Sequence, residues 1–587
     1  MNCLKSYFNF LCFLVCLLVS SSLSASTIYV DVAANGNSTG TDWLNAHTNL
    51  LSAINAAQSG DIIKIAEGVY YNSQPSYILK DRVSIYGGYP SLSRGIPLYW
   101  VDLLRNFRLY PTILTHSNRD ITNPIILINS NLSNQTILDG ITIKAINCVE
   151  VNTVTQMFFS PQFIDCIFEG TSLLINRGEH GFLVTNATNS YVLPQFLKCE
   201  FKNFNTACFR VKKRIGGGFY AINPMFYDCK FYDSSCGIDI YDLVNAAMNG
   251  GVMVQVDRCM FYNLKSSTVR KGGAFVIDGN NSRLIYTYVN NSAFYNNDAV
   301  LTGQFSNLSR LSTFSSCVNS FRNCTFYRNT GSRAFSLYDK DQGLLDSQQL
   351  PILFLYNCIS WGNINTAGKW IELDEGIHVD VKNSLLEITN VNSNGQYSNP
   401  AITLLNAHPT INRIKANSQT IFAQNPQFVS TSFITGINLR VQSSSPAINT
   451  GDNNIAYISK DLGGVNNRIL DNIVDMGAYE FCSFGDGACN PIEIKPIEED
   501  KRLGKQQIGT TNILDNDIIV FPNPATNQIN LKTTAQIVSV QLIDMKGQVL
   551  RSWENQQQLN IQNLPKGLYI LKVTTSENTQ SVRFVKE

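Results

Sequence analysis

The chain has 587 residues and a formal net charge of +1, and its composition is 44% hydrophobic, 11% aromatic and only 15% charged. A charge so close to neutral argues against a nucleic-acid partner or an anionic membrane as the main target. Many aromatic and few charged residues are typical of a strand-rich protein, and the length leaves room for more than one domain.

The first 25 residues carry the pattern of an export signal. Lys5 supplies a positive start, residues 11–19 form an apolar core, and small residues lead to Ala25. Such a core is too short to span a bilayer. We expect cleavage after Ala25, and we expect no transmembrane segment in the mature chain.

A short amphipathic helix is predicted near the start of the mature chain. One helical face within residues 45–57 is formed by Leu50, Leu51, Ile54 and Ala57. The residues that follow, IIKIA, are predicted to form a strand. Because a helix in front of stacked strands can cover an edge that would otherwise pair with other chains, we interpret residues 26–60 as an N-terminal cap.

The middle of the chain repeats one short phrase about every thirty residues. Its clearest copies read PQFIDCIF, PQFLKCEF, PMFYDCKF and VQVDRCMF. The central residues of the eight copies are Cys166, Cys199, Cys229, Cys259, Ser292, Cys324, Cys358 and Ser384. A fixed period of this kind indicates one supersecondary unit stacked on itself.

Side-chain spacing predicts a bend inside each copy. Phe163 stands three residues before Cys166 and Phe168 two after it, so the two rings cannot share one face of a single strand. The residue before the central Cys or Ser is Asp or Asn in most copies, which suits a left-handed bend, although Lys198 and Arg258 stand there in two. Strand, bend, strand and loop describe one coil of a parallel β-helix, here with about 13 coils and a length of ~65 Å.

Stacked coils would place the central thiols roughly 4.8 Å apart. We interpret them as an internal ladder of small side chains between phenylalanine stacks. The absence of a Cys-x-x-Cys pair and of a nearby His set argues against a metal. Parallel side chains at this spacing are badly oriented for disulfides. Outside the ladder, we predict a disulfide between Cys482 and Cys489.

Both ends of the repeat region resemble a known class. At the start, the matching segments are Tyr29–Asp31, Asp42–Trp43, Gly60–Asp61, Gly68–Tyr70, Ile85–Tyr89 and Thr136–Ile143. These segments resemble the start of secreted bacterial proteins of the pectin-lyase-like, right-handed β-helix class. At the end, Ser445–Gly451, Asp461–Gly464, Arg468 and Val474–Phe481 resemble the tail of choice-of-anchor Q domain proteins. The resemblance implies an all-β, right-handed parallel β-helix over residues 26–482, with residues 443–482 as its closing segment.

Four charged residues in the closing segment could cluster. They are Asp461, Arg468, Asp475 and Glu480. A catalytic interpretation is open to them, but we favour an arginine held by carboxylates where the last coil is closed off.

The last part of the chain changes character twice. Residues 483–515 are rich in charge and poor in aromatics, which is typical of a linker. Residues 516–587 alternate apolar and polar positions between turns, which predicts a small antiparallel, Ig-like β-sandwich. The segments Phe521–Pro524, Asp544–Gly547, Leu564–Tyr569 and Val585–Lys586 resemble the type A sorting domain of the type IX secretion system of Bacteroidetes. This resemblance implies recognition by that machinery, removal of the module, and release or attachment at the outer cell surface.

Two patches are candidate sites within the repeats. A basic run that could hold an anionic sugar, or be a solvated loop, consists of Arg210, Lys212, Lys213 and Arg214. Glu179 and His180 lie in a second patch, where the histidine could act as a base. Asp239, Asp242 and Asp278 could bind calcium, but their spacing matches no known ligand pattern.

Two functions follow from these features. The first is an exported, non-catalytic β-helix that binds glycans, mediates adhesion or is structural, with no cofactor or metal. The alternative is a lyase or glycosidase for acidic polysaccharide, where calcium would assist a lyase. The fold does not decide between them. A glycosidase needs two placed carboxylates, the motifs of β-helix pectinases are missing, and the chain has only five histidines.

Overall fold

The computed structural model describes residues 25–482 and 519–586, with gaps at 73–75, 118–120, 154–156, 172–179, 188–189, 213–219, 242–249, 267–272, 280–283, 306–315, 332, 340–352, 374–376, 390–400, 405–413, 433–435, 457–459, 465–466, 471, 522–524, 526, 534–535, 544–548, 566 and 577–578. The predicted signal peptide, apart from Ala25, and the predicted linker therefore lie outside the described residues. The chain divides into two compact units at Pro496 and Ile497.

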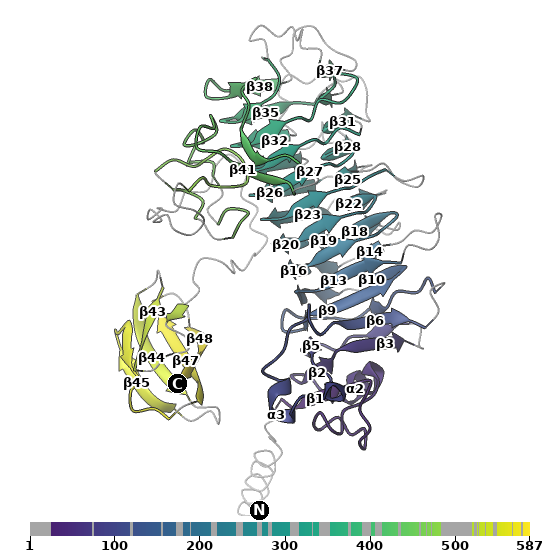
Figure 1. Cartoon of the computed structure of the whole chain (residues 1–587), viewed down its shortest axis with the longest axis vertical. Coiled ribbons are helices and arrows are strands. Elements are labelled where there is room, and N and C mark those ends of the chain that lie inside the picture. The colour runs from purple at the N-terminus through teal and green to yellow at the C-terminus, as the bar shows by residue number, and fades with distance from the viewer. Residues whose placement is uncertain are drawn as a thin grey trace, which may run out of the picture. The chain divides into compact units, whose positions relative to one another are not determined.

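Three long parallel sheets build the first unit (Figure 1). The first sheet contains, in order, β1 (Thr27–Val30), β2 (Ile62–Ala66), β5 (Ser84–Tyr89), β8 (Ile137–Asp139), β12 (Gln162–Ile164), β16 (Gln195–Leu197), β20 (Met225–Tyr227), β23 (Gly250–Asp257), β26 (Leu284–Asn290), β29 (Ser316–Arg322), β32 (Leu353–Tyr356), β35 (Val379–Lys382) and β38 (Ile414–Ala416). A side branch that joins β23 consists of β11 (Phe158–Phe159), β15 (Ser190–Val192) and β19 (Tyr220–Ile222).

The other two sheets follow the same order along the chain. The second sheet contains β3 (Gly68–Asn72), β6 (Thr112–His116), β9 (Ile141–Ala145), β13 (Ile167–Gly170), β17 (Glu200–Lys202), β21 (Lys230–Tyr232), β24 (Met260–Tyr262), β27 (Ala293–Tyr295), β30 (Thr325–Tyr327), β33 (Ile359–Trp361), β36 (Leu385–Leu386) and β39 (Ile421–Phe422). The third sheet contains β4 (Tyr77–Ile78), β7 (Ile126–Ile128), β10 (Asn147–Thr153), β14 (His180–Ala187), β18 (Ala207–Lys212), β22 (Cys236–Tyr241), β25 (Gly273–Gly279), β28 (Leu301–Phe305), β31 (Phe335–Asp339), β34 (Ile371–Leu373) and β37 (Ile402–Leu404). Each turn of the chain adds one strand to each sheet, so the prediction of a parallel β-helix is confirmed.

Aromatic columns fill the interior. The rings of Phe168 and Phe201 stack with centroids 4.5 Å apart, and the column continues coil by coil to Phe231, at 4.9 Å. A second column stacks Phe163 on Phe196 at 5.1 Å. All five side chains are fully buried. Their spacing follows the strand separation, because each ring sits on its equivalent in the next coil.

The bend between the first and second sheets is left-handed, as predicted. Positive φ angles between 44° and 56° occur at Asp165, Lys198, Asp228, Arg258, Asn291, Asn323, Asn357 and Asn383. Six of these bends are followed by a cysteine, each buried as a free thiol, and the other two by Ser292 and Ser384, which are also buried. The thiol of Cys199, for example, lies 3.3 Å from the carbonyl oxygen of Phe163 in the preceding coil, to which it donates. The ladder thus bonds to the backbone and contains no disulfides.

A ladder of buried asparagines, which we did not anticipate, follows the second sheet. The side-chain amide of Asn297 donates to Oδ1 of Asn329, and that of Asn329 donates to Oδ1 of Asn363, each over 2.9 Å. Each amide also donates to the carbonyl of a core phenylalanine. These bonds satisfy polar groups that would be costly to bury alone.

The predicted helix caps the first coil. Helix α2 (Leu50–Ala56) begins at Asn49, whose side chain accepts a hydrogen bond from the backbone N–H of Ser52. Its buried residues join the core formed by β1 and β2. Two further short helices follow, η1 (Leu92–Arg94) and α3 (Leu98–Val101).

The tail, residues 425–481, contains the antiparallel pair β40 (Phe428–Ser430) and β41 (Asn438–Val441). Its apolar residues pack on the outer face of the second sheet: Leu439, Met476 and Ala478 belong to one cluster with Ala293 and Ile359. The tail therefore covers the side of the β-helix over β27–β36, and not the end of the last coil as we expected. The reason is that this outer face carries apolar side chains that need covering.

Arg468 lies fully buried in the tail. Its Nη2 donates to the carbonyl oxygens of Asp475 and Gly477 over 2.9 and 2.6 Å and lies 3.2 Å from Oε1 of Glu480. With the Asn323 amide oriented so that its oxygen faces the guanidinium, Nε of Arg468 donates to that oxygen over 2.6 Å. Because Asn323 sits at the bend between β29 and β30, the arginine attaches the tail to a coil three turns before β38. Cys482, directly after the tail, is disulfide-bonded, while Cys489 lies outside the described residues.

The second unit is a small antiparallel sandwich. One sheet contains β42 (Ile519–Phe521), β43 (Gln528–Lys532) and β46 (Gln558–Asn560), and the other contains β45 (Val549–Glu554), β44 (Ile537–Ile543), β47 (Gly567–Thr575) and β48 (Thr579–Lys586). Residues of both sheets share one core.

The positive φ angle of Lys198 predicts that the backbone is strained at this residue. We expect Lys198→Asn to raise the free energy of unfolding by about 0.5 to 1 kcal/mol, because Asn tolerates a φ of +56° better than Lys does. Urea unfolding measures this. The matched control is Lys212→Asn on the exposed part of β18, where the same exchange should not stabilise. Equal effects at both positions would contradict the strain.

The burial of Arg468 predicts a large effect of its removal. Arg468→Ala should cost about 3 to 5 kcal/mol and lower the melting temperature, because Glu480 would remain buried without its partner. Arg94→Ala, which breaks an exposed pair with Glu67, should change the melting temperature little. An unchanged melt for Arg468→Ala would remove its structural role.

Candidate functional site

The predicted basic run is only partly described. Arg210 of β18 stands in register with Asp239 of β22, and the two side chains form an ion pair of 3.1 Å in which the carboxylate is fully buried. Lys212 is exposed at the end of β18. Lys213 and Arg214 lie outside the described residues. The charge of Arg210 is thus matched inside the protein.

His180 is buried at the start of β14. Burial, together with the charges of Arg210 and Lys212, lowers its pKa from 6.5 to about 3. The imidazole is therefore neutral at physiological pH, and a group with so low a pKa is a weak general base. Glu179 lies outside the described residues.

Of the three candidate calcium ligands, only Asp239 has a described side chain. Asp239 is paired with Arg210, Asp242 lies outside the described residues, and the side chain of Asp278 does too. Over the described ranges, no group of three or more His, Cys, Asp or Glu side chains could hold a metal ion.

An aromatic column runs along the outer face of the second sheet. In five successive coils the same register position holds Tyr232, Tyr262, Tyr295, Tyr327 and Trp361. The first three, which we call the tyrosine ladder, stack with centroids 4.9 and 5.0 Å apart and with nearly parallel rings. They are half-buried, so part of each ring faces solvent.

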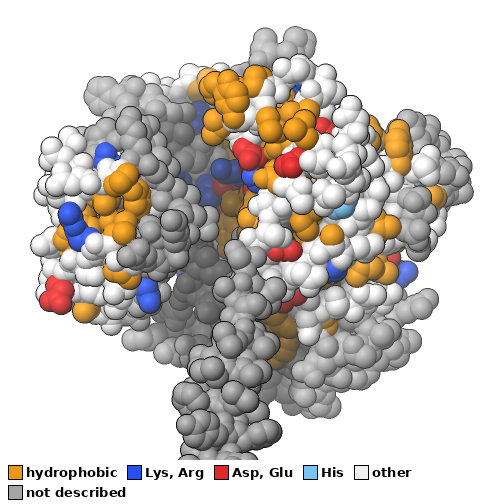
Figure 2. Space-filling model, turned by 90° about the horizontal axis from the view of Figure 1, so that it is seen from below, with side chains coloured by type: hydrophobic (Ala, Val, Ile, Leu, Met, Phe, Trp, Pro, Cys, Tyr) orange, Lys and Arg blue, Asp and Glu red, His pale blue; other side chains and the backbone are white. Residues whose placement is uncertain are grey.

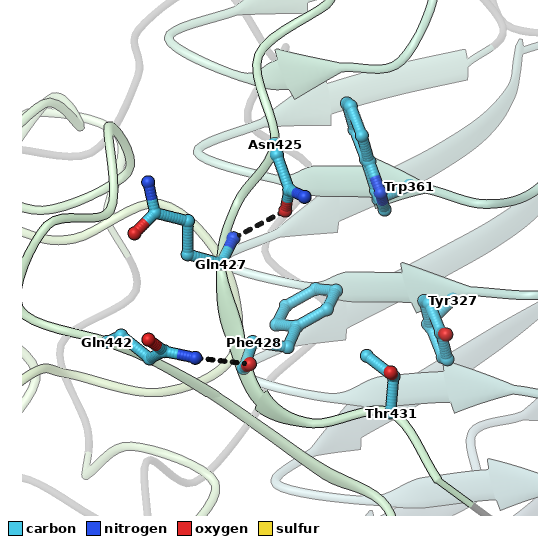
Figure 3. Close-up of a pocket in the computed structure, with 7 residues that line it drawn as sticks. All are labelled: Tyr327, Trp361, Asn425, Gln427, Phe428, Thr431 and Gln442. Carbon is cyan, nitrogen blue, oxygen red and sulfur yellow. Dashed lines mark hydrogen bonds between the residues drawn. The ribbon is translucent and has the colours of Figure 1, made fainter.

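The tail meets this column and forms a groove, the tail groove. The groove has a volume of about 340 Å³ and is lined by Tyr327, Trp361, Asn425, Gln427, Phe428, Thr431 and Gln442. In Figure 3 the two outer-face rings stand on one side and the tail residues on the other. Phe428 packs edge-on against Tyr327, with centroids 5.5 Å apart. Tyr327 is itself buried beneath Phe428, so Trp361 is the ring on the β-helix side of the groove that is partly exposed.

Uncharged amides form the polar part of the groove. Asn425 Oδ1 accepts a hydrogen bond from the backbone N–H of Gln427 over 2.8 Å, and Gln442 Nε2 donates to the carbonyl of Phe428 over 3.0 Å. These bonds fix the orientation of both amides (Figure 3). Each amide keeps further donor or acceptor positions for a ligand.

One partly buried carboxyl group bonds to the backbone directly after β33. Glu387 follows β36, and its Oε1 accepts the backbone N–H of Asn363, at the end of the asparagine ladder, over 2.8 Å. Burial raises its pKa to about 7, against the opposing effect of backbone hydrogen bonds. Glu387 is not among the residues that line the tail groove.

A separate hydrophobic surface surrounds α3. Its exposed residues are Leu98, Tyr99, Trp100, Leu103, Leu104 and Leu109. Figure 2 views the end of the β-helix that carries α2 and α3, where hydrophobic side chains gather with few charges among them.

The two residues that the β-helix contributes to the tail groove could be found from the sequence. The aromatic residue stands three positions after the central Cys or Ser in five successive copies, from Tyr232 to Trp361. This recurring aromatic position indicates a column of rings on the outer face, which our sequence-based prediction did not include. The residues from the tail could not be found in this way, because they lie outside the repeat and their position follows from the packing of the tail.

Comparisons with known proteins agree with this architecture. Residues 519–587 match the secretion system C-terminal sorting domain. The protein is thus a parallel β-helix that carries a type IX sorting domain, which marks it for export to the cell surface or beyond. No helix in the described ranges is both long and apolar enough to cross a bilayer. The resemblance of the tail to choice-of-anchor Q proteins stays a prediction.

Similar solved structures exist, but a search of curated proteins finds no match. The pectate lyase Pel9A is 13% identical, with a TM-score of 0.44 and coverage of 78% of this chain and 98% of that chain. The family 28 exopolygalacturonase of Yersinia enterocolitica is 10% identical, with a TM-score of 0.22 and coverage of 68% and 78%. The strand register of this chain establishes its fold, and neither likeness bears on its activity.

The low pKa of His180 predicts a pH-dependent stability. The unfolded chain takes up a proton at this histidine below pH 6.5, whereas the folded chain does so only near pH 3, so acid favours unfolding. Relative to His180→Gln, the wild-type protein should lose about 2 kcal/mol of stability between pH 7 and pH 5. Urea unfolding at several pH values measures this difference, and parallel profiles would contradict it.

Proposed function

We propose that this protein is exported to the cell surface or the medium and there binds a carbohydrate in the tail groove without cleaving it. The observation that carries the proposal is the pairing of aromatic rings with oriented, uncharged amides in one groove. Aromatic rings pack against the apolar faces of sugar rings, and amides can both donate to and accept from hydroxyl groups.

The absence of catalytic chemistry in the groove supports binding over cleavage. None of the seven residues that line it carries a carboxylate, whereas glycoside hydrolysis uses two of them on either side of the bond. Glu387 is a single carboxyl that is already engaged by the backbone of the asparagine ladder.

The sorting domain provides the means of delivery. Residues 519–587 would engage the type IX machinery, and their removal would leave the β-helix as the mature binding unit. A predicted signal peptide at residues 1–25 would bring the chain across the inner membrane first. The groove belongs entirely to the first unit, so it would remain after the sorting domain is removed.

Removal of Trp361 tests the proposal. A glycan array of cello-, xylo-, manno- and laminari-oligosaccharides, with polygalacturonate and alginate, identifies the ligand, and calorimetry then gives the affinity. Trp361→Ala should weaken binding tenfold or more, because the largest ring of the groove is lost. The control is Trp100→Ala, which removes an exposed Trp far along the chain from the groove and should leave the affinity unchanged.

Two results would overturn this function. Binding that survives Trp361→Ala but not Trp100→Ala would place the site at α3. Release of unsaturated or reducing ends from polygalacturonate or alginate by the wild-type protein, with or without calcium, would make the protein an enzyme.

A further inference from the structure

We infer that the tyrosine ladder extends the tail groove, so that the ligand is a linear, uncharged polysaccharide lying along the β-helix axis. This inference rests on the proposed function and adds the class of ligand. Its first basis is register: Tyr295, Tyr262 and Tyr232 occupy the position of Tyr327 and Trp361 in the three preceding coils and lie on the same outer face.

The geometry of the ladder determines what it can offer to a ligand. The rings of Tyr262 and Tyr295 are 5.0 Å apart with an interplanar angle of 1°, so their faces are covered by each other. Tyr295 also packs against the tail cluster, so what remains for a ligand is the solvent-facing part of the ring edges with the hydroxyl groups. One hydroxyl per coil gives a row of hydrogen-bonding groups with a step of ~4.8 Å, the strand separation.

The phenols stay protonated in this row. Burial raises the pKa of Tyr295 to about 12, and it raises the pKa of Tyr262 as well. A neutral phenol both donates and accepts a hydrogen bond, as a sugar hydroxyl does. Tyr232 differs, because its hydroxyl already donates to Oε2 of Glu200 over 3.0 Å.

A second row of polar groups accompanies the ladder. The residues directly after Tyr232, Tyr262 and Tyr295 are Asp233, Asn263 and Asn296, all at left-handed bends. The Asn263 amide donates to Oδ1 of Asp233 over 3.0 Å, and the Asn296 amide donates to Oδ1 of Asn263 over 2.5 Å. Amides and phenols thus run in parallel along the same coils.

We call the column from Tyr232 to Trp361 the track. The charged side chains beside the track favour an uncharged polymer as its ligand. At the start of the ladder, Glu200 pairs with Arg108 over 2.8 Å and with Lys230 over 3.6 Å. Glu200 therefore balances one of these two positive charges, and Asp233, directly after Tyr232, adds a second carboxylate beside the ladder. At the other end, the guanidinium of Arg328 lies over the ring of Tyr327, 5.3 Å from its centroid. An acidic polysaccharide would gain little electrostatic binding free energy from these side chains relative to its interactions with water and salt ions.

The length of the track sets the size of the ligand. Four coil steps separate Tyr232 from Trp361, which corresponds to ~19 Å at one strand spacing per coil. A single sugar at the end of a glycan would fill only the tail groove. A linear chain of several sugars would also reach the ladder.

Affinity as a function of chain length tests this inference. The probes are the disaccharide to octasaccharide members of the neutral series that binds best on the array, measured by calorimetry. The wild-type affinity should rise with length until the track is filled. The double variant Tyr262→Phe and Tyr295→Phe keeps the stacked rings and removes two hydroxyls. It should bind the octasaccharide about tenfold more weakly and the disaccharide unchanged, which is the fold-change expected for two hydrogen bonds.

The control is Tyr338→Phe, which removes a half-buried hydroxyl from the third sheet and should leave every affinity unchanged. Equal affinities for short and long chains would contradict a binding site that extends along the tyrosine ladder. An equal loss of affinity for both in the double variant would contradict it too. Neither result would contradict binding in the tail groove. Tighter binding of polygalacturonate or alginate than of any neutral chain would overturn the ligand class. A wild-type protein that binds no carbohydrate would instead reject the proposed function itself.

Discussion

The structure depends on one constraint: each coil must present, at every position, a side chain that fits the same position in the next coil. A coil of two or three short strands cannot bury its own apolar residues. Stacking Phe168 on Phe201 solves this inside, because identical rings in register leave no gap between coils. The backbone of each coil is satisfied in the same way, by the neighbouring strands and by the asparagine ladder that includes Asn329.

The same register that orders the core also orders the surface. A residue that recurs in the sequence at one position becomes a column on the outside of the β-helix, and the column from Tyr232 to Trp361 arises in this way. A repeat protein thereby presents an extended array of equivalent side chains. The distance between them is the strand separation, which backbone hydrogen bonding sets. An array of this kind suits a polymeric ligand, whose own groups also repeat.

The tail turns part of this column into a concave site. It packs on the outer face of the second sheet because residues such as Ile359 are apolar there, and Arg468 fixes it to the bend at Asn323. The buried arginine is satisfied by backbone carbonyls and an amide as well as by Glu480, which offsets part of the cost of burying its charge. Without the tail, Trp361 would stand on an open surface and the groove would not exist.

The sequence by itself determined the coil, its bend, the N-terminal helix and the sorting domain. These features are local or periodic: the side-chain spacing around Cys166 requires a bend, and Asp or Asn at the bend matches the left-handed backbone. Three features were decided only by the tertiary structure. The tail packs on the side of the β-helix, Arg210 pairs with Asp239 and is not part of an open basic patch, and Phe428 contacts Tyr327. These contacts join residues far apart in the chain, and which of them form depends on the apolar area that each arrangement buries, a property of the assembled surface that no local pattern contains.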